Sequence, residues 1–188
     1  IPTVGNLTPY TAINITGNNN QIVGCYIGIN NTGTTQGGAN MRVGIQINGG
    51  ANNSIGNGTP AGANLISGLV GAAAGSAIAI DQSTATGNTI KGNLIGLQKD
   101  GTTFVTNAAP AIYGIWIQSG AGANNAIGGT YSGEGNIISG ISGSSSAGIY
   151  LNNSTGTTLI LGNVICPAAS ESRVVTGGDG TQSFRIFL

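Results

Sequence analysis

The sequence predicts an all-β fold, a solenoid of about five turns with three short strands in each turn. Three observations support this: motifs of Asn, Ile and Gly recur along the chain, apolar residues alternate with a period of two, and 35 of the 188 residues are glycine. Self-similarity at a spacing of about 20 to 50 residues is typical of repeat architectures. The clearest copy is GNTIKGNLIG, residues 87–96, and its counterparts begin at Asn18, Asn52, Asn124 and Thr157.

Each copy opens with two apolar residues that are separated by a single residue. This period of two is that of a β-strand with one buried face, and helical spacing is nowhere evident. The pairs begin at Ile13, Ile45, Ile78, Ile115 and Ile149, which are 32, 33, 37 and 34 residues apart. One turn therefore takes about 34 residues, and loops absorb the insertions.

Two further short strands are expected in each copy, each centred on an isoleucine. Stacked turns place isoleucine over isoleucine, and the backbone groups of each inner strand pair with the turns on both sides. The second strand carries Ile22, Ile55, Ile90, Ile127 and Ile160, and the third carries Ile27, Ile66, Ile95, Ile138 and Ile165.

The whole chain, residues 1–188, is interpreted as one solenoid domain. Residues 1–11 form an N-terminal lead-in, 12–166 carry the repeats, and 167–188 form a C-terminal partial turn. Because the terminal turns of a repeat stack expose apolar ladders and strand edges unless they are capped, both ends are candidates for contact with another molecule. The candidate subunit-stacking residues are Phe184, Arg185, Ile186, Phe187 and Leu188 at one end, and Ile13 and Ile15 at the other.

Asparagine recurs at two corners of successive turns. Its backbone tolerates the left-handed conformation of a sharp corner, and its amide both donates and accepts, so that stacked copies can satisfy one another. The pattern therefore predicts two structural ladders, which Thr158 and Cys25 interrupt. One ladder comprises Asn20, Asn53, Asn88 and Asn125, and the other comprises Asn64, Asn93, Asn136 and Asn163.

These motifs, G-I-x-I followed by N-x-I-x-G-N-x-I-G, resemble those of right-handed parallel β-helix repeat proteins of the pectate-lyase-like superfamily, including repeats of large bacterial surface proteins. They occur at residues 44–47, 114–117, 148–151 and 87–96, and the resemblance covers about residues 12 to 166. It implies a right-handed coil, which the spacing does not show. The chain departs from the family in its longer loops, its broken ladders and the lack of an amphipathic helix before the first turn.

Charge is scarce, with five basic and five acidic residues spread along the chain. No basic stripe is present that could bind a phosphate backbone, so nucleic acid is not an expected partner. The sequence contains no apolar run of about 18 residues and no leader at its start, so we expect no membrane insertion. A composition rich in Asn, Thr, Ser and Gly favours an extracellular or cell-surface protein whose signal peptide has been removed.

The two cysteines, Cys25 and Cys166, fall about four turns apart in this solenoid. At about 4.8 Å for each turn they are roughly 19 Å apart, whereas a disulfide needs Cα atoms within about 7 Å. The favoured interpretation is two small buried apolar residues, and the alternative is a bridge between neighbouring molecules.

Candidate catalytic groups are few, and histidine is absent. Family members that act on acidic polysaccharides cluster their acids and bases, since that chemistry needs groups that act together. Here Asp100 and Glu134 could pair only if two separate loops converged, and no cofactor or metal site is predicted. The acidic residues are Asp81, Asp100, Glu134, Glu171 and Asp179, and the basic ones are Arg42, Lys91, Lys99, Arg173 and Arg185.

One outward column of the opening strands is a candidate contact surface for a glycan or a protein. Residues between the buried isoleucines point outward, which places Asn14, Gln46, Ala79, Trp116 and Tyr150 in line. Aromatic faces flanked by amides and a carboxylate suit sugar rings or another protein, although an ordinary aromatic pair on a sheet explains them equally simply. The candidate contact residues are Trp116, Tyr150, Gln118, Asp81 and Asn152.

The resulting hypothesis is a non-catalytic extracellular structural protein, either a subunit of a head-to-tail filament or adhesive surface layer or part of a longer repeat chain. Its expected partners are other copies of the chain or adjacent repeats. The alternative is a carbohydrate-binding or polysaccharide-degrading β-helix, with a polysaccharide as partner. An ice-binding protein is a remote third hypothesis, because threonines do not recur in every turn.

Overall fold

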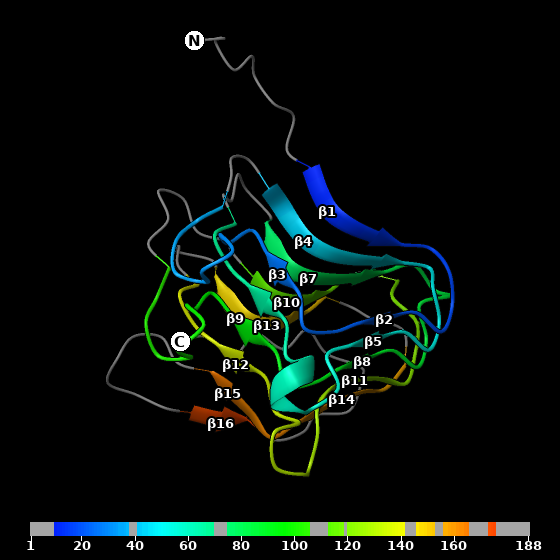
Figure 1. Cartoon of the computed structure of the whole chain (residues 1–188). Helices are drawn as coiled ribbons and strands as arrows, with labels where there is room; N and C mark the ends of the chain where they lie inside the picture. Colours follow the sequence, from blue (N-terminus) through cyan, green and yellow to red (C-terminus); the bar gives the residue numbers. More distant parts are fainter. Residues whose placement is uncertain are drawn as a thin grey trace, which may run out of the picture.

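The computed structural model describes residues 10–37, 41–69, 75–105, 113–118, 120–141, 146–152, 156–165 and 173–175. It is an all-β parallel solenoid with three sheets, as predicted (Figure 1). Five layers of strands make about four full turns, close to the predicted five. The described part contains almost no helix apart from one 3-10 turn, η1 (Pro60–Gly62).

Each turn contributes one strand to each sheet, and neighbouring turns pair in parallel. Sheet A has the longest strands, which run side by side in Figure 1. Sheet A contains β1 (Tyr10–Ile15), β4 (Met41–Asn48), β7 (Ser76–Asp81), β10 (Tyr113–Ile117) and β13 (Ala147–Leu151). Sheet B contains β2 (Gln21–Ile22), β5 (Ser54–Ile55), β8 (Thr89–Ile90), β11 (Asn125–Gly128) and β14 (Thr158–Leu161). Sheet C contains β3 (Tyr26–Ile27), β6 (Leu65–Ile66), β9 (Leu94–Ile95), β12 (Ile137–Ile138), β15 (Asn163–Ile165) and β16 (Arg173–Val175).

Ladders of isoleucine fill the interior. In sheet A, Ile78 pairs in register with Ile45 on one side and Ile115 on the other, and all three are fully buried. The same register joins the isoleucines of sheets B and C, which confirms the predicted core positions. Each full burial of such a side chain contributes about 2 kcal/mol, and stacking repeats it from turn to turn.

The strict alternation expected for sheet A breaks in β4, β7, β10 and β13, just before the first core isoleucine of each of these strands. A Cβ placed on Gly114 or Gly148 would lie 2.5 Å from the Cγ2 atom of Ile138 or Ile165, so these glycines face the interior. Ala77 occupies the same position in β7 and belongs to the core. Two consecutive residues therefore point inward, and the residue before them returns to the outer face.

Both asparagine ladders form as predicted. The Oδ1 atom of Asn88 accepts the backbone N–H of Asn53 at 2.8 Å and its side-chain amide at 3.0 Å. Asn136 accepts the same two donors from Asn93, at 3.0 and 2.8 Å. The second ladder also ties sheet C to sheet B, since each of its amides donates to an isoleucine carbonyl of sheet B. Every ladder residue except Asn20 is buried; they are Asn20, Asn53, Asn88, Asn125, Asn64, Asn93, Asn136 and Asn163.

The ladders end where the sequence breaks them. Thr158 lies in register with Asn125, but its buried Oγ1 atom has no hydrogen-bond partner. The amide of Asn125 donates instead to the carbonyls of Ala85 and Gly122, at 2.9 and 2.7 Å. Cys25 retains the backbone hydrogen bond of the second ladder, since its N–H donates to the Oδ1 of Asn64 at 3.0 Å. Cys25 is a free thiol packed against the core, whereas Cys166 lies outside the described residues.

The last described strand departs from the parallel pattern. β16 pairs antiparallel with β15, so it occupies the edge of sheet C that a further parallel turn would need. Of the predicted C-terminal partial turn, residues 167–188, the structure describes only β16, so that prediction stays untested. The candidate stacking residues 184–188 lie outside the described residues.

Candidate functional site

The outer face of sheet A carries the residues that the sequence singled out. Trp116 pairs in register with Ala79 on one side and Tyr150 on the other, and Gln46 pairs with both Ala79 and Asn14. The predicted outward column is therefore confirmed. Gln118 and Asn152 follow Ile117 and Leu151, which pair in register, and Asp81 follows Ile80 in the next strand, so these three residues form an adjoining column.

An aromatic cluster on this face includes a residue that the sequence analysis missed. The ring of Tyr113 stacks on that of Tyr150, with centroids 4.8 Å apart, and lies 5.2 Å from the Trp116 ring. Trp116 and Tyr150 are 6.4 Å apart and half-buried. The expected open platform of Trp116 and Tyr150 is thus a packed three-ring cluster. The glycine that precedes each core isoleucine was the available signal, because the inward turn at Gly114 brings Tyr113 to the outer face.

A groove of about 260 Å³ opens beside this cluster. Its walls come from β1, β4 and the end of β10, while the strand between them, β7, contributes no wall. The outward residues of β7 are Ser76 and Ala79, which are small and fully buried beneath their larger neighbours. Residues of the strands on either side therefore cover β7, and the groove is bounded by the side chains of those strands. The lining residues are Tyr10, Thr11, Arg42, Val43, Gln46, Trp116 and Gln118.

The groove offers hydrogen-bond donors and acceptors together with apolar surface. Gln46 and Gln118 carry amides, Thr11 a hydroxyl, and Arg42 a guanidinium that makes no salt bridge with a described acidic residue. The Nε1 atom of Trp116 is buried without a partner, so a molecule in the groove meets the carbon atoms of the indole. This combination suits a ligand with apolar ring faces and many hydroxyl groups.

The predicted contact residues divide into three groups by position. Trp116 and Gln118 line the groove, and Tyr150 supports Trp116 from the neighbouring turn. Asp81 and Asn152 are not among the lining residues. Asp81 accepts the backbone N–H of Gln82 at 2.7 Å, and the backbone N–H of Asn152 donates to the carbonyl of Ile117.

The two carboxylates considered for catalysis are each held by local partners. Glu134 forms an ion pair with Lys91 at 2.8 Å, and hydrogen bonds from Lys91 and from the backbone N–H of Tyr131 lower its pKa. Asp100 accepts hydrogen bonds from the hydroxyl and N–H of Thr103 and from the N–H of Thr102, which lower its pKa to about 2. Both carboxylates are therefore ionised at neutral pH and stabilise the loops that contain them.

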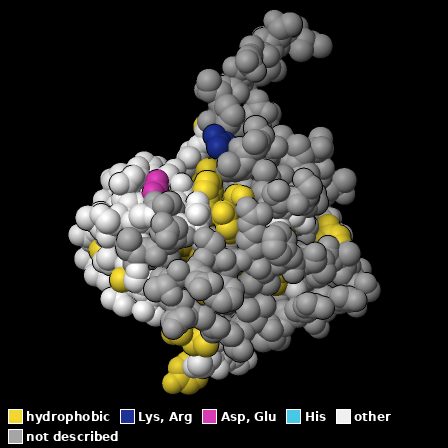
Figure 2. Space-filling view, turned by 180° about the vertical axis from the view of Figure 1, so that it is seen from behind, with side chains coloured by type: hydrophobic (Ala, Val, Ile, Leu, Met, Phe, Trp, Pro, Cys, Tyr) yellow, Lys and Arg dark blue, Asp and Glu magenta, His cyan; other side chains and the backbone are white. Residues whose placement is uncertain are grey.

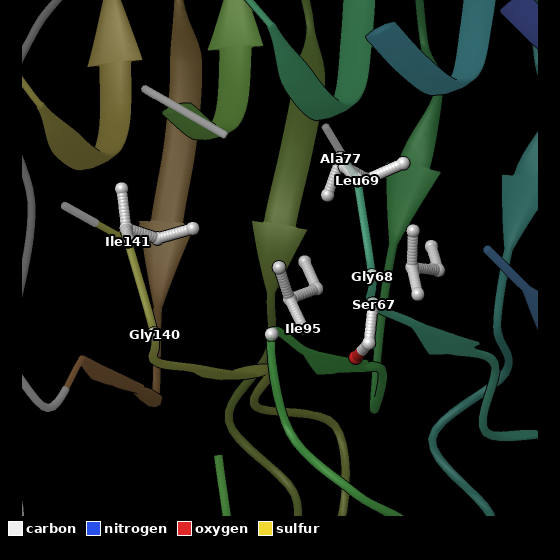
Figure 3. Close-up of a pocket in the computed structure, with 9 residues that line it drawn as sticks. Ser67, Gly68, Leu69, Ala77, Ile95, Gly140 and Ile141 are labelled. Carbon is white, nitrogen blue, oxygen red and sulfur yellow. The ribbon is translucent and has the colours of Figure 1, made fainter. Parts of the chain in front are cut away.

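A second cavity lies at the corner between sheets C and A. Leu69, Ile95 and Ile141 surround it in Figure 3, and its volume of about 10 Å³ is near the minimum for one water molecule. The hydroxyl of Ser67 already donates to the carbonyl of Leu97 at 2.7 Å. We interpret this cavity as a packing gap.

The first turn contains the remaining candidate stacking residues. Ile15 is buried, Ile13 is half-buried, and β1 pairs with β4 alone among the described strands. Among the described residues that can be seen in Figure 2, few side chains are charged. In the described ranges no helix has the length and apolar character needed to cross a membrane. Nor does that part of the chain contain a group of three or more His, Cys, Asp or Glu residues suited to a metal ion.

Comparisons with family models, with curated proteins and with solved structures give no match to this chain. The class of protein is therefore defined by its own geometry, a parallel β-solenoid with buried asparagine ladders. Membership of the pectate-lyase-like superfamily remains a prediction from the motifs.

Proposed function

We propose that the chain is a non-catalytic, extracellular carbohydrate-binding solenoid whose binding site is the groove on sheet A. The observation that carries this proposal is the groove of about 260 Å³, which combines Trp116 with the side chains of Gln46, Gln118 and Arg42. Aromatic carbon surface packs against the apolar face of a sugar ring, while amides and a guanidinium hydrogen-bond to its hydroxyl groups.

The position of the groove favours a glycan over an extended peptide. Peptides that bind to sheets usually add a strand at an open edge, where unpaired backbone groups supply the hydrogen bonds. The groove lies instead across the face of sheet A, where the backbone of β4, β7 and β10 is already paired on both sides. Recognition there depends on side chains.

A glycan array followed by titration calorimetry tests the proposal. Trp116→Ala removes the aromatic wall and should lower the affinity for the glycan found on the array by about tenfold. Tyr131→Ala is the matched control, because Tyr131 is 79% exposed and lies outside the groove lining. Equal affinity of wild type and Trp116→Ala, or no glycan bound at all, would contradict the proposal.

A groove-lining variant separates loss of binding from loss of packing. Gln46→Leu removes an amide that lines the groove and keeps a side chain of similar size, so we expect it to weaken binding while its thermal unfolding stays close to that of wild type. Unchanged binding by a folded Gln46→Leu protein would place the site elsewhere.

A structural role is the second candidate, in which copies or adjacent repeats stack end to end in a filament or adhesive surface layer. It is favoured by the first turn, where β1, β2 and β3 pair on one side only among the described strands. Asn20, the first residue of its ladder, is exposed there, while the buried Oγ1 of Thr158, at the other end of the same ladder, has no hydrogen-bond partner among the described residues. Light scattering over a range of concentrations, with Ile13→Lys as the edge variant, tests this role. A monomer at every concentration would exclude self-stacking.

A further inference from the structure

We infer that the groove on sheet A selects linear oligosaccharides that cross at least three strand spacings, with Trp116 and Tyr10 as two separate aromatic contacts. This inference rests on the proposed function and adds the size of the ligand and a role for Tyr10. Neither follows from the presence of a carbohydrate site alone.

The distance between the two aromatic residues sets the ligand length. Tyr10 lies on β1 and Trp116 on β10, with β4 and β7 between them in the order of sheet A. Three spacings of about 4.8 Å place these strands roughly 14 Å apart, and Tyr10 lies four residues, about 13 Å, before Asn14, the β1 residue in register with Trp116. One hexose ring is too short to contact both residues, whereas a chain of several rings laid diagonally across the strands reaches from one to the other.

The residues between the aromatic contacts suit the middle of such a chain. Arg42, Val43 and Gln46 line the groove from β4, next to the small residues of β7 that their neighbours cover. Gln46 and Arg42 can hydrogen-bond to hydroxyl groups of the central rings, and Gln118 lies at the Trp116 end. The groove therefore provides polar groups along its length and aromatic groups at both ends.

The two aromatic residues differ in how far they are buried. Trp116 is packed against Tyr113 and Tyr150, so its ring is already ordered before binding. Tyr10 is 44% exposed on the outermost strand of the sheet. We therefore expect every bound glycan to use Trp116, and only the longer ones to reach Tyr10.

Titration calorimetry with two series of oligosaccharides tests the inference. The probes are neutral β-1,4-linked glucose oligomers and β-1,4-linked uronic acid oligomers, each from one to six units. In the series that binds, affinity should rise at least tenfold from one unit to four and then level off. Tyr10→Ala should lower the affinity for the tetramer about fivefold and leave that for the dimer unchanged.

Tyr26→Ala is the matched control, since Tyr26 is 47% exposed but belongs to β3 in sheet C. Equal affinity for one and six units, or an equal effect of Tyr10→Ala at every length, overturns the inference while the carbohydrate site stands. No binding by either series, together with an empty glycan array, overturns both.

Discussion

Replacing Asn93 by alanine should remove one of the best-connected buried side chains of the solenoid. Its amide donates to the Oδ1 of Asn136 at 2.8 Å and to the carbonyl of Ile55 at 2.9 Å. Its Oδ1 accepts the side-chain amide and the backbone N–H of Asn64, at 2.9 and 3.3 Å. At about 1 kcal/mol for each hydrogen bond, Asn93→Ala should lower the free energy of unfolding by about 4 kcal/mol.

Asn20→Ala is the internal control for this loss. Asn20 is the first residue of the other ladder and is exposed, and its amide donates to the Oδ1 of Asn53 at 3.0 Å. Water can replace such a partner at the surface, so we expect a loss below about 1 kcal/mol. Urea unfolding followed by far-ultraviolet circular dichroism gives both values. If Asn93→Ala were no more destabilising than Asn20→Ala, the ladders would not stabilise the fold as described.

Three other perturbations have defined outcomes. Thr158→Asn should extend the first ladder, remove the unpaired buried Oγ1 of Thr158 and raise stability by about 1 kcal/mol, and a lower thermal midpoint would argue against this. The carboxylate of Asp100 should stabilise its loop fully above about pH 4, near its ordinary pKa of 3.8, and lose this effect as the pH falls toward its lowered pKa of about 2. The chemical shift of the Thr103 amide proton should follow the titration of the Asp100 carboxylate, and Asp100→Asn should abolish this pH dependence. Arg42→Gln should weaken the binding of uronic acid oligomers about tenfold and that of neutral oligomers less, as measured by calorimetry at low salt. An equal loss of affinity for both series would show that Arg42 does not interact with the carboxylates of the ligand.

Regular repetition made the core predictable. The first core isoleucines of the sheet A strands are 32 to 37 residues apart, and a period of two assigns them to one face. Their register could therefore be predicted from the sequence alone. Each ladder asparagine lies two residues before the core isoleucine of the second or third strand. A buried amide needs hydrogen-bond partners, so the asparagines of neighbouring turns are expected to stack.

The groove was less predictable, because it depends on local exceptions to the repeat. Period-two alternation places Tyr113 inside, whereas the inward turn at Gly114 places it outside. The groove also depends on larger residues of the neighbouring strands that cover the small side chains of β7, and a repeat pattern does not show such differences between turns. The partners of carboxylates on irregular loops could not be predicted from the repeat either. Glu134 pairs with Lys91 of the preceding turn, and no periodicity indicates this ion pair.

Trp116 is the only tryptophan in the chain and lines the groove, so its fluorescence tests the central claim most directly. Titration with a glycan that binds by calorimetry should shift the indole emission in a saturable manner, with the same dissociation constant as the calorimetric one. Gln46→Leu should weaken both signals together. A glycan that binds tightly without altering the emission of Trp116 would contradict the assignment of the site to this groove.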